Sequence, residues 1–358
     1  MNCTLRSFNA STTTTPTTSN SSAGGDPALQ QALPELCDFN TSCRFRSHWG
    51  WLVLMISLAS VTCSANLLSL VVLRRMHATM SPVMRLALMN LSLTDVVGSL
   101  SYIYHSVMSF TTLEVVGVEC KIRYLFYVGM NVVTLYTLIY MTVERLVAVT
   151  LPFLHVRVDG KKFTAVALTL IWVASMATLV SGMHRLRTDL DLCLYHVMVP
   201  KTTHLLNASL ALPTIVFIVL SNLALYVRAR REITKIGRTM VSSAEDNQRE
   251  RQLAHMAEKA ASTTLAVVVP FASFNTPLYV LMLVFYCRPE FMYSCRSVGL
   301  LMSFSTLLVL NSLCNPIIYA WKLRPVQVEL AKMLRMRCLA RKSGPAPTVV
   351  STVVTRLS

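Results

Sequence analysis

Seven long apolar stretches constrain the fold of this chain more than any other feature of its sequence. At about 1.5 Å of rise per residue, a helix of about twenty apolar residues crosses a hydrocarbon core of roughly 30 Å. Several stretches exceed that length, which predicts helices that tilt or extend beyond the bilayer. The sequence therefore predicts an all-α membrane protein, a bundle of seven transmembrane helices over Trp49–Leu73, Pro82–Phe110, Gly117–Leu151, Phe163–Gly182, His204–Arg228, Met256–Tyr286 and Ser297–Trp321.

The distribution of charge predicts how the bundle is oriented. Charged residues make up 14% of the chain, well below the roughly 25% of a soluble domain. The net charge of +16 would suit a nucleic acid or an anionic lipid surface, so its placement decides between them. With the amino terminus outside, 23 of the 33 Lys and Arg residues lie on the cytoplasmic side. This positive-inside asymmetry explains the basicity with the lipid bilayer, and no nucleic acid, as a partner, and it predicts a multi-pass membrane protein whose amino terminus lies outside.

Residues 1–48 read as an extracellular tail that precedes the first span. The segment is rich in Thr, Ser and Asn and contains four acceptor sequences for N-glycosylation. No cleavable signal precedes this tail, so the first span is expected to serve as the signal anchor. The predicted glycosylation sites are Asn2, Asn9, Asn20 and Asn40.

Two further segments follow the bundle, which occupies residues 49–321. Residues 322–338 place apolar side chains among basic ones, which favours a short amphipathic helix on the inner leaflet, with Cys338 available for palmitoylation. A frayed basic tail is the alternative for this segment. Residues 339–358 are rich in Ser and Thr and are expected to form a disordered cytoplasmic tail with phosphorylation sites.

Four cysteines are candidates for disulfide bonds on the outer side. Cys120 begins the third span and Cys193 lies in the loop between the fourth and fifth, so a bridge between them would pin that loop across the mouth of the bundle. Cys287 and Cys295 bracket one short loop and could close on each other. Spacing does not determine pairing, and the outer cysteines are odd in number, which leaves one thiol over.

Asp95 is the acid that lies in the middle of a span. A buried carboxylate without a partner is costly, so it needs a cation or several hydrogen-bond donors. Asn311 and Asn315 lie one turn apart on the seventh span and supply such donors. The group is either a satisfied polar cluster without a ligand or an ion site that biases two packings of the bundle.

Taken together, the motifs of the seven spans resemble the rhodopsin-like (class A) G-protein-coupled receptors over roughly Trp49 to Cys338. The matching positions are Asn66, Leu91, Asp95, Cys120, Arg145, Trp172, Pro213, Phe271, Pro277 and the run Asn315-Pro316-Ile317-Ile318-Tyr319.

The resemblance implies a cell-surface receptor that passes the binding of an extracellular ligand to a heterotrimeric G protein when the sixth helix swings outward. Arrestin and a receptor kinase are further implied partners. An allosteric sodium ion is the implied metal, bound at Asp95, and no other cofactor is expected. The implied coupling residues are Glu144, Arg145 and Tyr319, and the implied sodium pocket consists of Asp95, Thr134, Asn311 and Asn315.

Four positions depart from the pattern of that family. Leu146 replaces the tyrosine after the acid–arginine pair, and Ser221 stands where a tyrosine normally steadies the active state. Asn275 replaces the usual tryptophan two residues before Pro277, and Ala257 takes the place of the acid that often bridges the arginine, although Glu258 is adjacent. These departures concern the trigger and the basal activity of the receptor.

The ligand is not determined by the motifs. Tyr127 occupies the place where amine receptors carry an aspartate, which disfavours a biogenic amine held by a salt bridge. Arg123 could bind a carboxylate or a phosphate, or it could be an interfacial cation without a ligand. Parts of the second and third spans resemble fish-type odorant receptors, a likeness that does not select a ligand. The candidate ligand-binding residues are Arg123, Tyr124, Tyr127, Asn131, Asn275 and Tyr279.

Other classes of membrane protein are less well supported. The sequence lacks the paired intramembrane acids of an aspartyl protease and the common hydrolase motifs, so no enzyme is expected. It also lacks repeated halves and a filter sequence, which makes a transporter or channel less favoured. A constitutively active orphan receptor that needs no small ligand remains the main alternative to a ligand-activated one.

Overall fold

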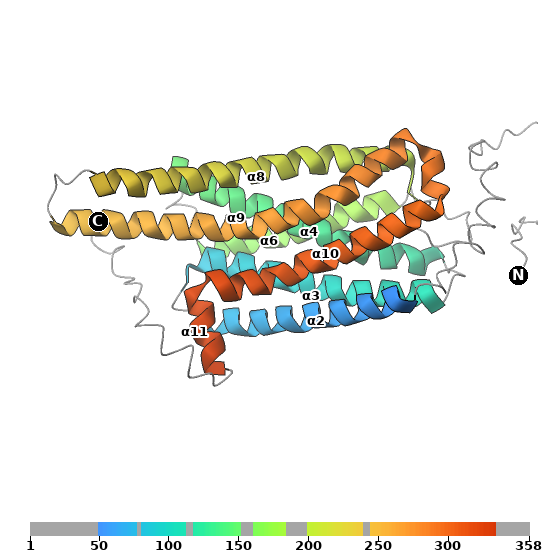
Figure 1. The fold of residues 1–358 in the computed structure, drawn as a ribbon, viewed down its shortest axis with the longest axis horizontal. Helices are drawn as coiled ribbons and strands as arrows, with labels where there is room; N and C mark the ends of the chain where they lie inside the picture. Colours follow the sequence, from blue (N-terminus) through green and yellow to red (C-terminus); the bar gives the residue numbers. More distant parts are fainter. Residues whose placement is uncertain are drawn as a thin grey trace, which may run out of the picture.

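The computed structural model describes residues 49–76, 80–111, 117–151, 160–183, 199–238 and 244–333, and these form long helices that run side by side (Figure 1). Seven of the helices are long and apolar enough to cross a membrane, which confirms the seven predicted spans. The elements are α2 (Trp49–Arg75), α3 (Pro82–Thr111), α4 (Gly117–Thr150), α6 (Lys161–Met183), α8 (Lys201–Arg238), α9 (Ala244–Cys287), the 3₁₀ helix η2 (Pro289–Tyr293), α10 (Cys295–Lys322) and α11 (Arg324–Met333).

The fifth and sixth spans extend well beyond the length that a bilayer requires. α8 has 38 residues and α9 has 44, and their paired ends project past the rest of the bundle (Figure 1). Their apolar stretches lead directly into charged residues with good helix propensity, so the helical pattern continues into the predicted cytosol. The prediction that these two helices continue beyond their apolar runs is confirmed.

Prolines lie inside three of the helices without ending them. They are Pro213 in α8, Pro270 and Pro277 in α9, and Pro316 in α10. A proline inside a helix removes one backbone hydrogen bond, and membrane helices tolerate this where neighbouring helices satisfy the freed carbonyl. The long helices of this bundle are therefore compatible with their prolines.

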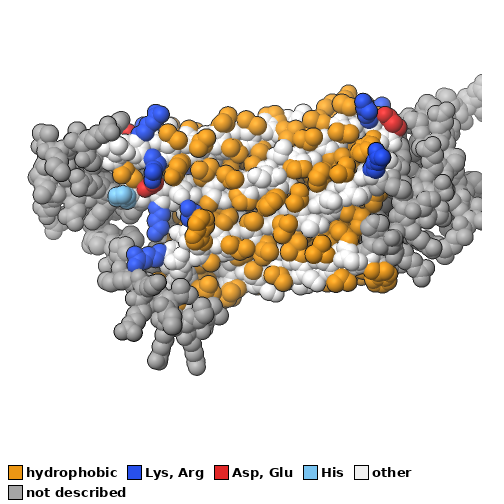
Figure 2. Space-filling model, in the orientation of Figure 1, with side chains coloured by type: hydrophobic (Ala, Val, Ile, Leu, Met, Phe, Trp, Pro, Cys, Tyr) orange, Lys and Arg blue, Asp and Glu red, His pale blue; other side chains and the backbone are white. Residues whose placement is uncertain are grey.

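The helices differ greatly in how deeply they lie in the bundle. In α3, 61% of the most apolar stretch of the helix is buried inside the protein, whereas the corresponding share in α6 is 17%. One side of α6 presents Phe163, Val166, Leu170 and Val173, each more than half exposed. Figure 2 shows an apolar band around the middle of the molecule, with Lys and Arg side chains gathered at its ends. α3 is thus a central helix, and α6 a peripheral helix whose apolar side suits lipid.

The main apolar core joins α2, α3, α4, α8, α9, α10 and α11. It includes Leu91, Leu138, Ile218 and Phe271, all of them almost completely buried. Because lipid tails are as apolar as leucine, this core gains its stability mainly from close packing. Polar contacts between helices therefore matter for which helices are held together and where.

α11 follows the last span after a single residue, Leu323. It turns away from the bundle axis (Figure 1), and Val326 and Ala331 are its buried residues. The predicted helix after the last span is confirmed over residues 324–333. Residues 1–48 with the four glycosylation sites, residues 334–338 with Cys338, and the tail 339–358 lie outside the described residues.

Of the cysteines expected to form disulfides, Cys120 is bonded and Cys287 is free. Cys120 is fully buried and disulfide-bonded, while Cys193 lies outside the described residues, so this pairing stays a prediction. Cys287 ends α9 with an exposed, free thiol, so the suggested closure on Cys295 is not formed. The turn is built instead by η2 and by Ser294, whose hydroxyl accepts a hydrogen bond from the Ser297 amide at 3.3 Å.

Candidate functional site

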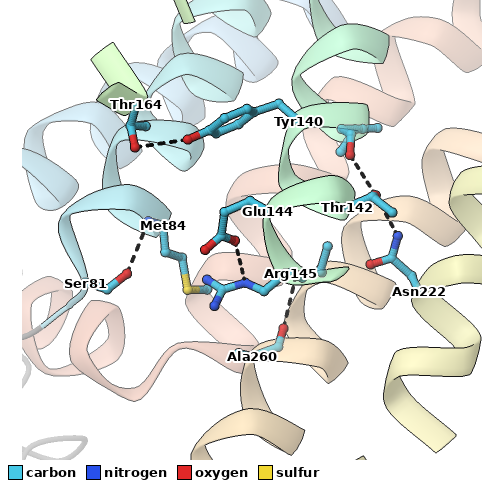
Figure 3. A network of polar contacts seen from close by, with 11 residues as sticks. Ser81, Met84, Tyr140, Thr142, Glu144, Arg145, Thr164, Asn222 and Ala260 are labelled. Atoms are coloured by element: carbon cyan, nitrogen blue, oxygen red, sulfur yellow. Dashed lines mark hydrogen bonds and ion pairs between the residues drawn. The ribbon is translucent and has the colours of Figure 1, made fainter. Parts of the chain in front are cut away.

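The carboxyl-terminal half of α4 carries a half-buried ion pair. The Arg145 Nε atom lies 3.1 Å from a carboxylate oxygen of Glu144, and the two side chains are 24% and 14% exposed. Figure 3 shows this pair between α4 and its neighbouring helices. The guanidinium is a fixed cation with several donors, and part of it is exposed.

Two side-chain hydrogen bonds near this pair join α4 to its neighbours (Figure 3). The Tyr140 hydroxyl donates to Thr164 Oγ1 of α6 at 3.0 Å. The Asn222 amide of α8 donates to Thr142 Oγ1 at 2.8 Å, and both of these residues are buried. The stretch of α4 that leads to Arg145 is therefore tied to helices on two sides.

The acid next to Ala257 on the sixth helix is used in another pair. Glu258 lies 3.0 Å from Arg230 of α8, and its other oxygen lies 3.8 Å from His255 on its own helix. Among the described residues, the ion pair of Arg145 is with Glu144 on the same helix and not with α9. The sequence left open whether Glu258 replaces the acid missing at Ala257; in the structure its carboxylate faces α8.

Tyr319, the third expected coupling residue, is not at the surface. It is 1% exposed and belongs to the main apolar core together with Ile318 and Leu323. The structure thus leaves Glu144 and Arg145 partly exposed and keeps Tyr319 inside the bundle.

The predicted sodium pocket lies between α3, α4 and α10. Asn315 Nδ2 donates to a carboxylate oxygen of Asp95 at 2.7 Å. The Thr134 hydroxyl lies 3.5 Å from that of Thr94, the residue before Asp95. Asp95, Thr134, Asn311 and Asn315 are all buried. The structure brings Asp95 and Asn315 into contact, and it buries the other two predicted members.

The chemistry of this pocket fits a small monovalent cation. The ion pairs of the described residues do not include Asp95. No three His, Cys, Asp or Glu side chains cluster in the described ranges, so a bound ion would meet one carboxylate and neutral oxygens. One carboxylate with hydroxyl and amide oxygens suits a hard ion of low charge.

Further polar bonds hold the frame around Asp95. Asn66 of α2 donates to the Ser312 carbonyl of α10 at 3.1 Å. The Trp172 indole of α6 donates to Asn90 Oδ1 of α3 at 2.8 Å, and Asn90 Nδ2 donates to Thr137 Oγ1 of α4, also at 2.8 Å. These bonds fix the separation of the helices that flank the pocket.

Tyr127 is the centre of an aromatic group in the amino-terminal half of α4. Its ring centroid lies 5.0 Å from that of Tyr102, 4.6 Å from that of His105 and 6.0 Å from that of Tyr124. Its hydroxyl is hydrogen-bonded to Ser305 of α10. The residue that stands in the place of an amine-binding aspartate therefore links α3, α4 and α10.

Asn131 and Arg123 extend this group along α4. Asn131 Nδ2 donates to the Tyr102 hydroxyl at 3.2 Å. The Arg123 side chain is 1% exposed and pairs with Glu119, one turn earlier, at 3.1 Å, and Tyr104 donates to the same carboxylate at 3.0 Å. Arg123 is therefore not an open interfacial cation, and its charge already has an anionic partner within the protein.

The candidate residues on α9 are buried as well. Asn275 is 1% exposed, and its amide donates to the Phe271 carbonyl at 2.9 Å. Its Oδ1 atom has no hydrogen-bond partner among the described residues. Tyr279 is also buried and packs in the main core. Asn275 thus offers an acceptor inside the bundle where the family pattern expects a tryptophan.

The sequence motifs do not predict a role for Thr142, Asn222 or His105. Asn222 is the one amide side chain between Pro213 and Tyr226 in an otherwise apolar stretch, and that isolation was the available signal. His105 ends the polar-aromatic run Tyr102-Ile103-Tyr104-His105. Thr142 gave no signal, because threonine is common in membrane helices and its partner is on another helix.

The fold and the placement of these motifs define a seven-helix membrane receptor. The sequence model of the family described as 7 transmembrane receptor (rhodopsin family) matches residues 65–319. The chain therefore belongs to the rhodopsin family of G-protein-coupled receptors, and it is a multi-pass membrane protein and not an enzyme. Among the curated proteins, none matches the chain.

Proposed function

We propose that this receptor transmits the binding of an extracellular ligand to a heterotrimeric G protein through outward movement of α9. The observation that carries the proposal is the half-buried Arg145–Glu144 pair at the cytoplasmic end of α4. A guanidinium placed there can donate to carbonyls of an inserted segment once α9 moves aside. Glu144 holds the guanidinium in the resting state, and Tyr319 takes part after it leaves the core.

Ligand binding is proposed for the outer half of the bundle. Tyr127 and Tyr124 offer aromatic faces, Asn131 lies one turn from Tyr127, and Asn275 offers an unmet acceptor. Arg123 is neutralised by Glu119, so the site favours an uncharged ligand with a hydrogen-bond donor over a carboxylate or a phosphate. Tyr279 completes the proposed set on α9.

Other features of the receptor are proposed with it. The amino terminus is extracellular and glycosylated, with a Cys120–Cys193 bond over the mouth of the bundle. α11 lies on the inner leaflet, and Cys338 beyond it is palmitoylated. A sodium ion at Asp95 stabilises the resting state, and arrestin and a receptor kinase act on the tail.

A second candidate is a receptor that signals constitutively without a small ligand. It is favoured by one observation: Glu258 pairs with Arg230 of α8, so in the described residues no ion pair ties Arg145 to α9. Resting receptors without that tie have one restraint less on helix movement.

The test is nucleotide exchange on a panel of purified G proteins by the expressed receptor without added ligand. We expect Arg145→Ala to reduce exchange by at least tenfold at equal surface expression. Arg75→Ala, which removes an exposed arginine at the end of α2, is the control and should change little. Equal exchange by Arg145→Ala and the unmodified receptor would contradict the proposed role of Arg145. Nucleotide exchange without added ligand would favour the constitutively active receptor. If no exchange occurs, the next step is a screen of uncharged ligands.

A further inference from the structure

The hydrogen bond between Asn222 and Thr142 joins α8 to α4 inside the bundle. One hydrogen of the Asn222 amide goes to Thr142 Oγ1 at 2.8 Å, and the amide also donates to the Ile218 carbonyl at 2.8 Å. The Thr142 hydroxyl in turn donates to the Leu138 carbonyl at 2.7 Å. Both side chains are at most 1% exposed. Separation of the two helices would therefore leave a buried donor without a partner, which is costly.

This bond lies close to Arg145, the residue proposed to contact the G protein. Thr142 lies three residues before Arg145 on α4, almost one helical turn away, and Figure 3 shows both with Asn222. Asn222 follows Ser221, the position where the family pattern has a tyrosine that steadies the active state. The bond thus lies beside the place from which that tyrosine is missing.

α8 is also attached to the helix that moves in the proposed function. Arg230 and Glu258 form an ion pair at 3.0 Å between α8 and α9. The two helices run side by side to their cytoplasmic ends (Figure 1). This ion pair is largely exposed and contributes little by itself, but Ile218 of α8 and Phe271 of α9 also lie in the same buried apolar core. A restraint that holds α8 against α4 therefore also acts on α9.

We propose that the Thr142–Asn222 hydrogen bond is a latch that holds α8, and through it α9, against α4 in the resting receptor. The proposal rests on the proposed function, because it assigns the restraint on the same helix movement. In receptors with an acid in place of Ala257, the sixth helix can be tied directly to the arginine. Here Glu258 is engaged by α8, and the restraint passes from α4 to α8 by a neutral, buried bond.

The first test removes the bond from either side. Thr142→Val and Asn222→Leu take away the acceptor and the donor without adding a charge. Buried hydrogen bonds between membrane helices shift an equilibrium by about threefold on average and by up to about fifteenfold. We expect a rise of that size in ligand-independent nucleotide exchange at equal surface expression. The double variant should rise no further than the stronger single variant, because one bond is lost in all three.

The chain offers a matched control two residues away on the same helix. Tyr140 also bonds to a threonine of a neighbouring helix, because its hydroxyl donates to Thr164 Oγ1 at 3.0 Å. Its bond joins α4 to α6 and not to α8. Tyr140→Phe should lower thermal stability without raising nucleotide exchange, and Thr142→Ser, which keeps the hydroxyl, should behave as the unmodified receptor. A similar rise in Tyr140→Phe would show general loosening and overturn the latch.

The second test is independent of any G protein. Spin labels on unnatural amino acids that replace Arg75 of α2 and Lys259 of α9, both exposed, report the separation of the two helices in purified receptor. We expect Thr142→Val to enlarge the population at longer distance, and Tyr140→Phe to leave it unchanged. A longer distance without a rise in exchange would support the latch and contradict the proposed coupling. An unchanged distance distribution in Thr142→Val would overturn the latch itself.

Discussion

At the scale of single residues, Asp95 combines deep burial with a charge that the described ion pairs do not balance. Its carboxylate is 3% exposed and accepts a hydrogen bond from Asn315. Ser312 is a second hydrogen-bond donor to this carboxylate, but two neutral donors do not offset the cost of removing a carboxylate from water. The side chain therefore has to be protonated or to meet a cation. Neutral polar groups are compatible with a protonated carboxyl and with a carboxylate that binds a cation. Three such groups are the hydroxyls of Thr134 and Thr94 and the amide of Asn311.

We predict that sodium stabilises this receptor and that Asp95 is responsible. A ligand at ten times its dissociation constant stabilises the native state by about 1.4 kcal/mol, or about 2–4 °C for a domain of this size. Thermal unfolding of purified receptor in NaCl, compared with KCl at equal ionic strength, should show this shift. The Asp95→Asn variant keeps an acceptor for Asn315 and should lose the sodium-dependent shift.

The control for this experiment is Glu119→Gln, which removes an acid near the outer end of α4. It should keep the sodium-dependent shift, because Glu119 pairs with Arg123 and lies outside the pocket. A sodium-dependent shift of equal size in Asp95→Asn would show that the ion binds elsewhere.

At the scale of elements, α6 is the helix that the rest of the bundle buries least. Two side-chain hydrogen bonds connect it to the bundle: Trp172 to Asn90 at 2.8 Å and Tyr140 to Thr164 at 3.0 Å. Apolar burial between helices gives little net gain in lipid, so these bonds carry a large share of the attachment of α6.

We therefore predict that Trp172→Phe and Tyr140→Phe each lower the free energy of unfolding by about 0.5–1.5 kcal/mol. Tyr140→Phe removes the hydroxyl donor alone, whereas Trp172→Phe removes the N–H donor together with part of the indole ring, so its loss is expected at the upper end of this range. Their effects should add, because the two bonds have no shared residue. Thermal unfolding measures the loss, and hydrogen exchange should rise in α6 before other helices.

Tyr104→Phe is the matched control, since it removes a tyrosine hydroxyl at an exposed position. It should cost less than either variant and leave exchange in α6 unchanged. If the α6 variants exchange no faster than Tyr104→Phe, the attachment of α6 is due to packing alone.

The spans could be predicted from the sequence because their length and low charge allow few other structures. The positions of α8 and α9 beyond the bilayer were also predictable, since a helical pattern continues past Arg228 and before Met256. The suggested Cys287–Cys295 pairing was wrong, because Cys287 is free although the length of the loop would permit closure. Asn222 was missed because sequence alone does not show which neighbour an isolated amide meets. The pairing of Arg123 with Glu119 was within reach, as the two lie four residues apart on one helix.

At the scale of the whole molecule, charge and apolar surface are separated along the bundle axis. Figure 2 shows the apolar band with basic side chains at its ends. The projecting ends of α8 and α9 and the short helix α11 lie at the same end of the bundle (Figure 1). That end carries most of the basic residues counted on the cytoplasmic side, so the shape and the charge indicate the same orientation.

We predict that residues 1–48 face the outside of the cell and that the carboxyl terminus faces the cytosol. An antibody should label an epitope tag at residue 1 in intact cells and a tag at residue 358 only after permeabilisation. A glycosidase should reduce the apparent mass of the receptor, and replacement of Asn2, Asn9, Asn20 and Asn40 by Gln should abolish that reduction. Asn207→Gln is the control. The sequence Asn207-Ala208-Ser209 also matches the acceptor pattern, but it lies within α8, where no glycan can be added, so this change should have no effect on the apparent mass. Labelling of the carboxyl-terminal tag in intact cells would reverse the orientation, and Arg145 would then lie on the wrong side of the membrane to meet a G protein.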